Sequence, residues 1–136
     1  MVKIEATYEG DLRCKAIHGP SGTELVTDAP TDNMGRGESF SPTDLVATAL
    51  ATCIATTMGI IARRKDIELP NMRIHVEKHM TTEAPRRIAS LPIKIWIPLP
   101  ADYSERALLE SAANGCPVHR SLHPDVAKPI EFIWGE

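Results

Sequence analysis

Three cysteines, Cys14, Cys53 and Cys116, carry the most reactive side chains of this 136-residue sequence. They are far apart, and none belongs to a CxxC pair. An odd number of cysteines does not suit a secreted disulfide scaffold, so we expect the reducing cytoplasm as the compartment. A cysteine there is buried and inert, bound to a metal, or redox-active, and the spacing alone leaves all three uses open.

Cys53 lies near the middle of 18 consecutive residues without a charge, from Leu45 to Ala62. Cysteine is among the residue types most often buried, so an inert core thiol is the simplest interpretation of Cys53 alone. If the segment is a helix that starts after Ser41, Cys53 lies about 18 Å from the helix N-terminus, too far for the helix dipole to lower its pKa. A reactive Cys53 therefore needs a cation from elsewhere in the fold, and arginine is the best candidate.

Cys116 follows Asn114-Gly115, which end a helix, and precedes Pro117. This order predicts Cys116 as the N-cap of a short helix that extends to about His123, a position that favours a thiolate. On local grounds Cys116 has the stronger case for a lowered pKa, although Gly115-Cys116-Pro117 is also consistent with a simple turn. Cys14 lies in a predicted strand without a nearby signal, and we interpret it as a structural or bystander thiol.

A zinc site is an alternative use of the segment 116–123. The segment has the pattern C-x2-H-x3-H, and His18 could supply the fourth ligand. The usual paired ligand spacing is absent, so we expect no metal. His75 and His79 share one face of a predicted strand and are expected at the surface. The sequence lacks GxSxG, a P-loop and GxGxxG, which argues against a serine triad and a nucleotide cofactor.

The uncharged segment is predicted to be a long helix. Ser41 is the expected N-cap, Pro42 takes the first helical position, and Asp44 completes a capping box. The helix is expected to end near Lys65, where basic residues suit the helix dipole.

Alternating apolar residues and turn signals predict six strands and a second long helix around this segment. In the predicted strand 88–97, Leu91, Ile93, Ile95 and Ile97 share a face, while Pro92 indicates an edge or a bulge. The second helix, 103–113, has Ser104 as its expected cap. The predicted strands are Val2–Tyr8, Leu12–His18, Thr23–Thr27, Met72–Met80, Ile88–Ile97 and Ile130–Trp134. The sequence therefore predicts a single α+β domain, residues 1–136, with mainly antiparallel sheet.

A helix that is apolar on all sides is either in lipid or buried on all sides. Alanine and threonine dominate it, with Thr48, Thr52 and Thr56 in a stripe, so we expect no membrane span. A second copy of the chain would cover the exposed side, and we therefore predict a homodimer. The net charge of −3 gives no reason to expect nucleic acid or an anionic membrane as a partner.

The motif SPTDLVATALATC, followed about 60 residues later by GCPVHRSL, resembles the OsmC/Ohr family of osmotically inducible and organic hydroperoxide resistance proteins. The resemblance extends over nearly the whole chain and implies an OsmC-like fold, in which sheets wrap around long central helices in an intertwined homodimer. It also implies a thiol-dependent peroxidase that reduces organic hydroperoxides and is regenerated by an external dithiol, often lipoyl-linked, with no bound cofactor.

By the same resemblance, Cys53 is the residue that attacks the peroxide and Cys116 the one that forms a disulfide with it. Arg13 is the closest match to the family's activating arginine, and Arg36 is the alternative. Dedicated peroxidases of the family pair that arginine with a glutamate ten residues before the helix cysteine. Here Thr43 stands at that position and Asp44 follows it, which places the chain nearer the OsmC-like branch.

A different class of function stays open beside the peroxidase. The same fold would serve as a dimeric module that binds small molecules, or senses oxidants and electrophiles through its cysteines without turnover. The Thr43 departure favours this alternative.

Overall fold

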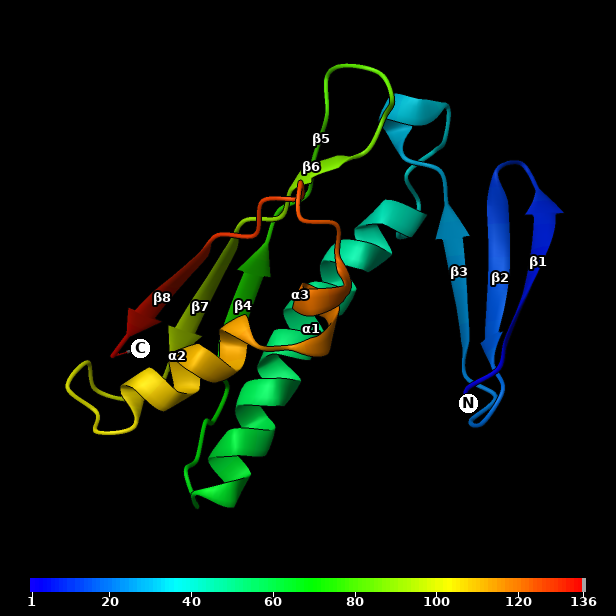
Figure 1. Cartoon of the computed structure of the whole chain (residues 1–136). Helices are drawn as coiled ribbons and strands as arrows, with labels where there is room; N and C mark the ends of the chain where they lie inside the picture. Colours follow the sequence, from blue (N-terminus) through cyan, green and yellow to red (C-terminus); the bar gives the residue numbers. More distant parts are fainter. Residues whose placement is uncertain (136) are drawn as a thin grey trace. The chain divides into compact units, whose positions relative to one another are not determined.

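The computed structural model describes residues 1–135, and these form two compact units. Unit 1 comprises Met1–Val46 and unit 2 begins at Ala47, within the long helix that both units share (Figure 1). The expectation that residues 1–136 form a single domain stays a prediction.

Unit 1 is an antiparallel meander of three strands, β1 (Ile4–Gly10), β2 (Arg13–His18) and β3 (Glu24–Asp28). The first two predicted strands are confirmed and pair as a hairpin, although β1 starts and ends two residues later than expected. Asp11 and Leu12 make the tight turn with φ angles of 54° and 64°, in the left-handed region.

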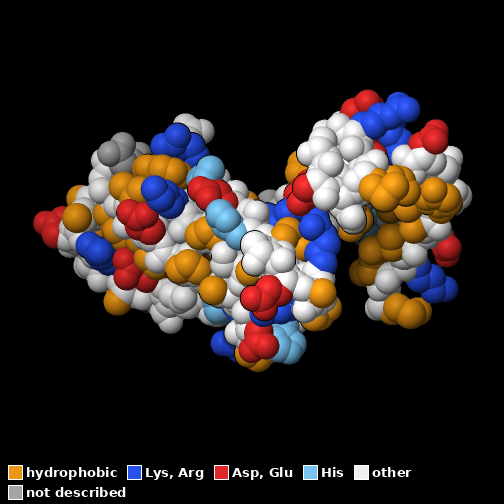
Figure 2. All heavy atoms as spheres, turned by 90° about the horizontal axis from the view of Figure 1, so that it is seen from above, with side chains coloured by type: hydrophobic (Ala, Val, Ile, Leu, Met, Phe, Trp, Pro, Cys, Tyr) orange, Lys and Arg blue, Asp and Glu red, His pale blue; other side chains and the backbone are white. Residues whose placement is uncertain are grey.

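The strand register places Ile4, Ala6, Tyr8, Ala16 and Leu25 on one face of the unit 1 sheet. Ile4, Ala6 and Tyr8 lie opposite His18, Ala16 and Cys14, and Ala16 lies opposite Leu25. Ile4 and Tyr8 are 63% and 65% exposed, and Leu25 is 44% exposed. Figure 2 shows hydrophobic side chains gathered over the surface of this unit. One chain alone therefore leaves this apolar face in contact with water.

Helix α1 (Pro42–Arg64) begins as predicted. The Asp44 N–H donates to Ser41 Oγ at 3.1 Å, and the Ser41 N–H donates to Asp44 Oδ2 at 2.9 Å. This reciprocal pair confirms the capping box. The helix ends at Arg64, one residue before the expected Lys65.

Unit 2 contains a three-stranded sheet in the order β4 (Arg73–Val76), β7 (Ile93–Ile97), β8 (Ile130–Trp134), and a small pair, β5 (His79–Met80) with β6 (Ile88–Ser90). The expected strand 72–80 is thus split at Glu77-Lys78, and the expected strand 88–97 is split at Leu91-Pro92. Proline cannot donate to a ladder, so it interrupts the run rather than marking an edge: β7 is the central strand of its sheet.

β7 and β8 are parallel, which departs from the mainly antiparallel pattern. Parallel neighbours need a crossover, and it contains α2 (Arg106–Asn114) and α3 (Pro117–Ser121). The prediction of Ser104 as the cap of α2 was wrong: Glu105 is the N-cap, and its side chain makes no capping bond.

The core of unit 2 joins helix and sheet. Leu91, Ile93, Ile95 and Ile97 are at most 2% exposed, which confirms their predicted shared face. They are buried together with residues of α1 and α2, namely Leu50, Ile54, Met58, Leu109 and Ala113. These contacts fix α1 and the crossover on the sheet.

Helix α1 is long and apolar enough to cross a membrane by length and composition, with a mean hydropathy of 2.0 over 18 residues. Core helices of soluble proteins meet the same criterion, so one such helix is weak evidence for a span.

Candidate functional site

Cys53 lies in the middle of α1, on the border between its buried and exposed faces. Its neighbours Leu50 and Ile54 are fully buried, whereas Thr52 and Thr56 are exposed. Cys53 itself is half-buried. The helix therefore holds this sulfur against the core while part of the side chain remains accessible.

Cys116 is fully buried at the start of α3, where it forms the predicted N-cap. Its Sγ accepts a hydrogen bond from the His119 N–H at 3.2 Å, and Pro117 takes the first helical position. The stop at Asn114-Gly115 and the cap at Cys116 bring this thiol back toward α1.

The two cysteines, 63 positions apart in the sequence, are neighbours in unit 2. Burial raises the pKa of Cys116, and the adjacent Cys53 raises it further, while the His119 amide opposes the shift. The expectation of a lowered pKa at Cys116 was therefore wrong, because desolvation outweighs the N-cap bond. Cys116 is held as a neutral thiol beside the half-buried Cys53, and both are free cysteines.

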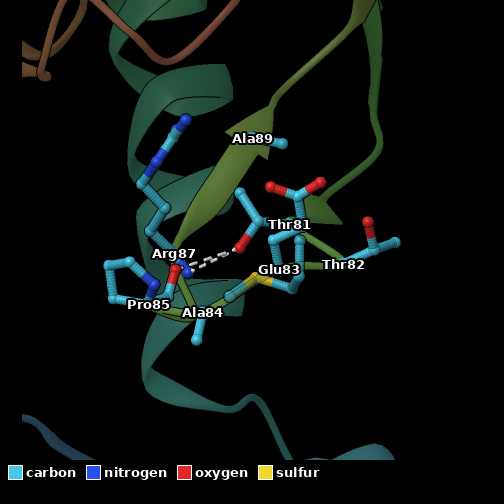
Figure 3. A pocket seen from close by; sticks show the side chains of 8 residues that line it. Thr81, Thr82, Glu83, Ala84, Pro85, Arg87 and Ala89 are labelled. Carbon is cyan, nitrogen blue, oxygen red and sulfur yellow. Dashed lines mark hydrogen bonds between the residues drawn. The ribbon is translucent and has the colours of Figure 1, made fainter.

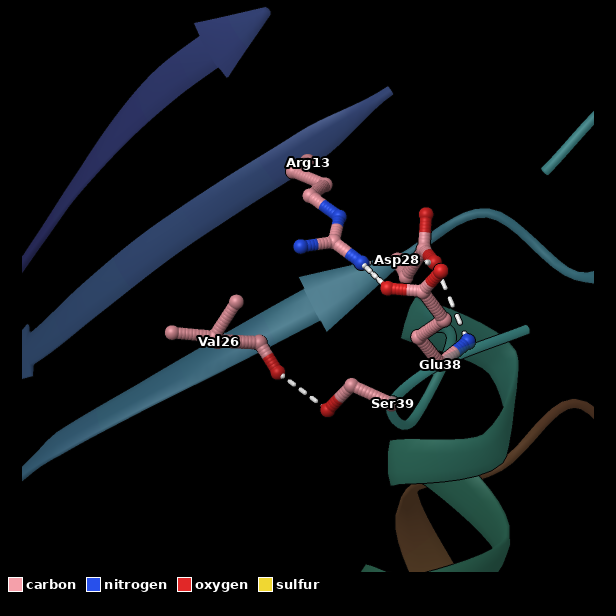
Figure 4. A network of polar contacts seen from close by, with 5 residues as sticks. All are labelled: Arg13, Val26, Asp28, Glu38 and Ser39. Carbon is pink, nitrogen blue, oxygen red and sulfur yellow. Dashed lines mark hydrogen bonds and ion pairs between the residues drawn. The ribbon is translucent and has the colours of Figure 1, made fainter. Parts of the chain in front are cut away.

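Arg13 belongs to unit 1, where two carboxylates hold it (Figure 4). Its Nη2 lies 3.5 Å from Asp28 Oδ2 and makes a short ion pair with Glu38. These partners raise the pKa of Arg13, with Glu38 the larger cause. Asp28 is 1% exposed, and its pKa is lowered first by the hydrogen bond from the Glu38 amide.

Sequence reasoning missed Asp28 and Glu38. The predicted strand Thr23–Thr27 stops one residue short of Asp28, whereas in the structure Asp28 ends β3 and lies directly opposite Arg13 in the register. The sequence did contain a signal for this: a lone acid at the end of a strand, across a hairpin from an arginine.

Thr43 and Asp44 both take part in the helix cap. Thr43 Oγ1 lies 3.2 Å from Ser41 Oγ, and Asp44 closes the capping box. The alternative cation, Arg36, lies exposed in the loop before the helix. Whether any of these residues acts on Cys53 stays a prediction.

The histidines of the zinc hypothesis have other surroundings. His18 Nδ1 lies 2.6 Å from Ser21 Oγ, and His123 Nδ1 accepts from the Asp125 N–H. Within residues 1–135, no group of three His, Cys, Asp or Glu is arranged to hold a metal ion. His75 and His79 are exposed, as expected, and both contact Glu77.

A hollow of about 450 Å³ lies in the loop between β5 and β6 (Figure 3). The Arg87 N–H donates to Thr81 Oγ1 at 3.1 Å, which braces the loop across its base. No cysteine lines this hollow, so we do not assign the cysteine chemistry to it.

The family model of OsmC-like proteins matches residues 35–128, which include both Cys53 and Cys116. No curated protein matches the sequence at a significant level.

Solved structures resemble the chain over nearly its full length. A Psychrobacter arcticus protein, provisionally named an osmotic stress induced and detoxification response protein, is 42% identical with a TM-score of 0.90, and the match covers 97% of this chain and 96% of that one. An organic hydroperoxide resistance protein OsmC of Legionella pneumophila has a TM-score of 0.79 at 16% identity, covering 98% and 96%. The organic hydroperoxide resistance protein OhrB of Bacillus subtilis has a TM-score of 0.70 at 15% identity, covering 97% of each chain.

The last two matches show the fold, because their identities are low. The matched family model and the 42% identity to the Psychrobacter arcticus protein show the family as well as the fold. The α+β fold is that of the OsmC/Ohr proteins, and the chain belongs to the family of OsmC-like proteins.

Proposed function

We propose that the protein is a cysteine-based peroxidase that reduces organic hydroperoxides. The observation that carries the proposal is the pair in unit 2: a half-buried Cys53 beside a fully buried Cys116 whose pKa is raised. An accessible sulfur suits attack on a substrate, and a protonated thiol next to it suits the resolving step, because it does not compete as a nucleophile until the first step is complete.

The reaction would run in three steps. The Cys53 thiolate attacks the outer oxygen of ROOH, the O–O bond breaks, and the alkoxide takes a proton to leave as ROH, with Cys53 now a sulfenic acid. Cys116 then attacks that sulfur and water leaves, which gives a disulfide. An external dithiol reduces the disulfide by exchange, and a cyclic disulfide of that reductant departs.

A cation would assist the first step in two ways. It would stabilise the Cys53 thiolate, and it would stabilise the negative charge that develops on the leaving oxygen. Arg13 is our candidate for this role. Its firm placement by Asp28 and Glu38 supports a side chain whose position matters.

The proposal is tested with cumene hydroperoxide and dihydrolipoamide. We expect Cys53→Ser to abolish peroxide consumption, and Cys116→Ser to accumulate sulfenic or overoxidised Cys53. After one equivalent of hydroperoxide, intact-mass and peptide analysis of the wild type should show a Cys53–Cys116 disulfide that dihydrolipoamide reverses.

Cys14→Ser is the matched control and should keep turnover, because Cys14 lies on the sheet of unit 1 opposite Tyr8, where we assign it no role. Full turnover by the Cys53→Ser protein would refute the proposal.

We also propose that the protein is a homodimer. Two observations support it: the exposed apolar face of the unit 1 sheet, and the exposed side of α1, where Thr52, Thr56 and Gly59 are exposed beside the 47%-exposed Ile60. A second copy of the chain would bury both. Sedimentation at micromolar concentration should give twice the chain mass of 14.9 kDa, and a monomer would contradict the proposal.

The partners we propose are an organic hydroperoxide and a soluble or lipoyl-linked dithiol, with no bound cofactor, metal, nucleic acid or membrane. The site would work in the cytoplasm, where a dithiol pool is available.

One observation favours a sensor without turnover. Thr43, at the position where dedicated peroxidases of the family place a glutamate, is engaged with Ser41 at the helix cap. If the cysteines stay reduced after hydroperoxide but react with a small electrophile such as N-ethylmaleimide at Cys53, the sensing function is favoured over the peroxidase.

A further inference from the structure

Helix α2 leads into the turn that carries Cys116, and the helix alone does little to fix that turn. It has nine residues, of which Leu109 and Ala113 are buried, and the side chain at its N-cap makes no capping bond. So short a helix is marginal by itself and depends on tertiary contacts. The position of Cys116 therefore depends on what else holds α2 to the rest of unit 2.

A triangle of three side chains, Arg106, Glu110 and Trp134, joins α2 to the last strand, and we call it the Glu110 clamp. Glu110 Oε1 accepts a hydrogen bond from Trp134 Nε1–H at 3.0 Å and another from Arg106 Nε–H at 3.2 Å. On the third side, the Arg106 guanidinium lies 5.3 Å from the centre of the Trp134 ring, within the range of a cation–π contact. The Glu110 side chain is 28% exposed, so water competes less for these bonds than at an exposed pair.

The strand end of the Glu110 clamp is fixed. Trp134 pairs with Ile97 in the parallel register of β8 on β7. The next amide, Gly135 N–H, donates to Leu99 O at 2.7 Å. Trp134 is thus held by the sheet, whose central strand is part of the core, and the Glu110 clamp ties α2 to that sheet.

The helix end of the Glu110 clamp reaches the reactive sulfur through the backbone. Cys116 lies six positions after Glu110, and the Glu110 carbonyl oxygen accepts Asn114 Nδ2–H at 3.0 Å at the end of the helix. Hydrogen-bonded elements of this kind pass a displacement on to the residues that follow. A disulfide needs its two Cβ atoms about 3.5–4.5 Å apart, so a small shift of α2 changes how well Cys116 reaches Cys53.

We propose that Glu110 is a positioning residue for the Cys53–Cys116 pair: by holding α2 on β8, it keeps the Cys116 thiol within bonding reach of Cys53. Arg106 and Trp134 in turn hold the Glu110 carboxylate in place. The inference rests on the proposed function, which makes these two cysteines the pair that forms the disulfide. It adds that the efficiency of this step depends on a contact between a helix and a strand.

The experiment measures the effective concentration of the two thiols in a glutathione redox buffer. Glutathione disulfide accepts two electrons and two protons from the Cys53 and Cys116 thiols, which become a disulfide, and it leaves as two molecules of glutathione. Peptide mass spectrometry gives the fraction of protein with this disulfide. All variants are made in a Cys14→Ser parent, which removes the third thiol. This reading needs no peroxide and does not depend on peroxidase activity.

We expect Glu110→Ala to lower the effective concentration about ten-fold, because both hydrogen bonds to the carboxylate are lost. Trp134→Phe removes one donor and keeps an aromatic ring, so it should lower the effective concentration about three-fold. Glu110→Gln should stay within about two-fold of the parent, because the amide oxygen can still accept from both donors. This rescue by the conservative variant would separate the hydrogen bonds from the mere presence of a side chain.

Two control variants separate positioning from general loss of stability. Glu105→Ala is the matched control, since it removes an acid at the N-cap of the same helix whose side chain makes no capping bond. Ile95→Val weakens the core elsewhere in unit 2. Both should stay within about two-fold of the parent in effective concentration. Circular dichroism checks that each variant is folded, and Trp134→Phe decides the matter if Glu110→Ala is not.

An unchanged effective concentration in Glu110→Ala overturns the inference, and so does an equal loss in Glu105→Ala or Ile95→Val. An equal loss in Glu110→Gln, or an unchanged value in Trp134→Phe, overturns it as well. A parent protein that forms no Cys53–Cys116 disulfide in the redox buffer also overturns it.

A second reading uses cumene hydroperoxide with dihydrolipoamide. A displaced Cys116 leaves the Cys53 sulfenic acid open to a second hydroperoxide molecule, which oxidises it to sulfinic acid and leaves as an alcohol. Glu110→Ala should therefore be inactivated at an about three-fold lower hydroperoxide concentration than the parent, and inactivation at the same concentration overturns the inference. If the parent forms the disulfide with glutathione but shows no turnover with hydroperoxide, the proposed function fails, and the glutathione equilibrium alone judges the Glu110 clamp.

Discussion

The capping box at the start of α1 allows a sharp test of whether Asp44 serves structure or catalysis. Ser41 is 1% exposed, and its Oγ accepts the Asp44 N–H while Asp44 Oδ2 accepts the Ser41 N–H. Ser41→Ala removes one of these bonds and Asp44→Ala the other. Loss of an N-cap side chain costs about 1 kcal/mol, and about 2 kcal/mol where the freed amide is shielded from water.

We therefore expect each variant to lower the free energy of unfolding by about 1–2 kcal/mol. With an m-value of about 1.5–2 kcal/mol per molar urea, the unfolding midpoint should fall by roughly 0.5–1 M. The measurement is urea unfolding followed by far-UV circular dichroism, at one fixed protein concentration because a dimer makes the midpoint concentration-dependent. Asp44→Glu is the control, since glutamate also closes a capping box and should recover most of the loss.

A purely structural Asp44 would leave the proposed peroxidase activity of the folded protein almost unchanged. We expect kcat/KM of Asp44→Ala to stay within about three-fold of the wild type under conditions where the protein is fully folded. A loss of ten-fold or more in kcat/KM, together with an unchanged urea midpoint, would refute our reasoning and assign Asp44 to the arginine instead.

Three further predictions concern unit 2. Ile95→Ala, at a fully buried position of the central strand, should destabilise the protein by about 2–5 kcal/mol in the same urea assay, and a loss below about 1 kcal/mol would contradict the core assignment. Burial, and then the charge of Lys128, lower the pKa of His119 from its usual 6.5. The stability that the neutral imidazole contributes is therefore present above that pH. It is lost as the pH falls below 6.5, because the unfolded chain takes up the proton first. His119→Gln should therefore flatten the pH dependence of the unfolding free energy between about pH 7 and 5, and an unchanged slope would count against the burial of this imidazole. Iodoacetamide should label Cys116 in the reduced protein with a pH midpoint above the thiol's usual 9.0, and a midpoint near 7 would show that the N-cap bond outweighs burial.

The sequence predicts well those features that depend on residues close together in the chain. The cap at Ser41, the helix that carries Cys53 and the shared face of Ile93 and Ile95 follow from spacings of two to four residues, and the structure confirms each. The N-cap at Cys116 is also local, and it too is confirmed.

What the sequence does not reveal depends on contacts between distant segments. The pKa of Cys116 rises because α3 is packed into the core, and no neighbour in sequence signals that burial. The contact of Arg13 with Glu38 needs both the β2–β3 register and a loop folded back on Asp28. The split of the expected strand 88–97 depends on Pro92. The effect of this proline is local, but its place at a break and not at an edge is set by the position of β7 between β4 and β8.

The parallel pairing of β7 with β8 has a consequence for the order of folding. α1 forms from local contacts, whereas α2 and α3 are fixed at both ends only after residues 130–134 have paired beside β7. Pairing across such a sequence separation is slow compared with helix formation. A chain that meets hydroperoxide while it is still folding therefore exposes Cys53 before Cys116 is in place. With Cys116 as the resolving thiol, as we propose, oxidation in that interval would lead past the sulfenic acid to irreversible products. Chains refolded in the presence of peroxide should then lose activity that chains oxidised after folding retain.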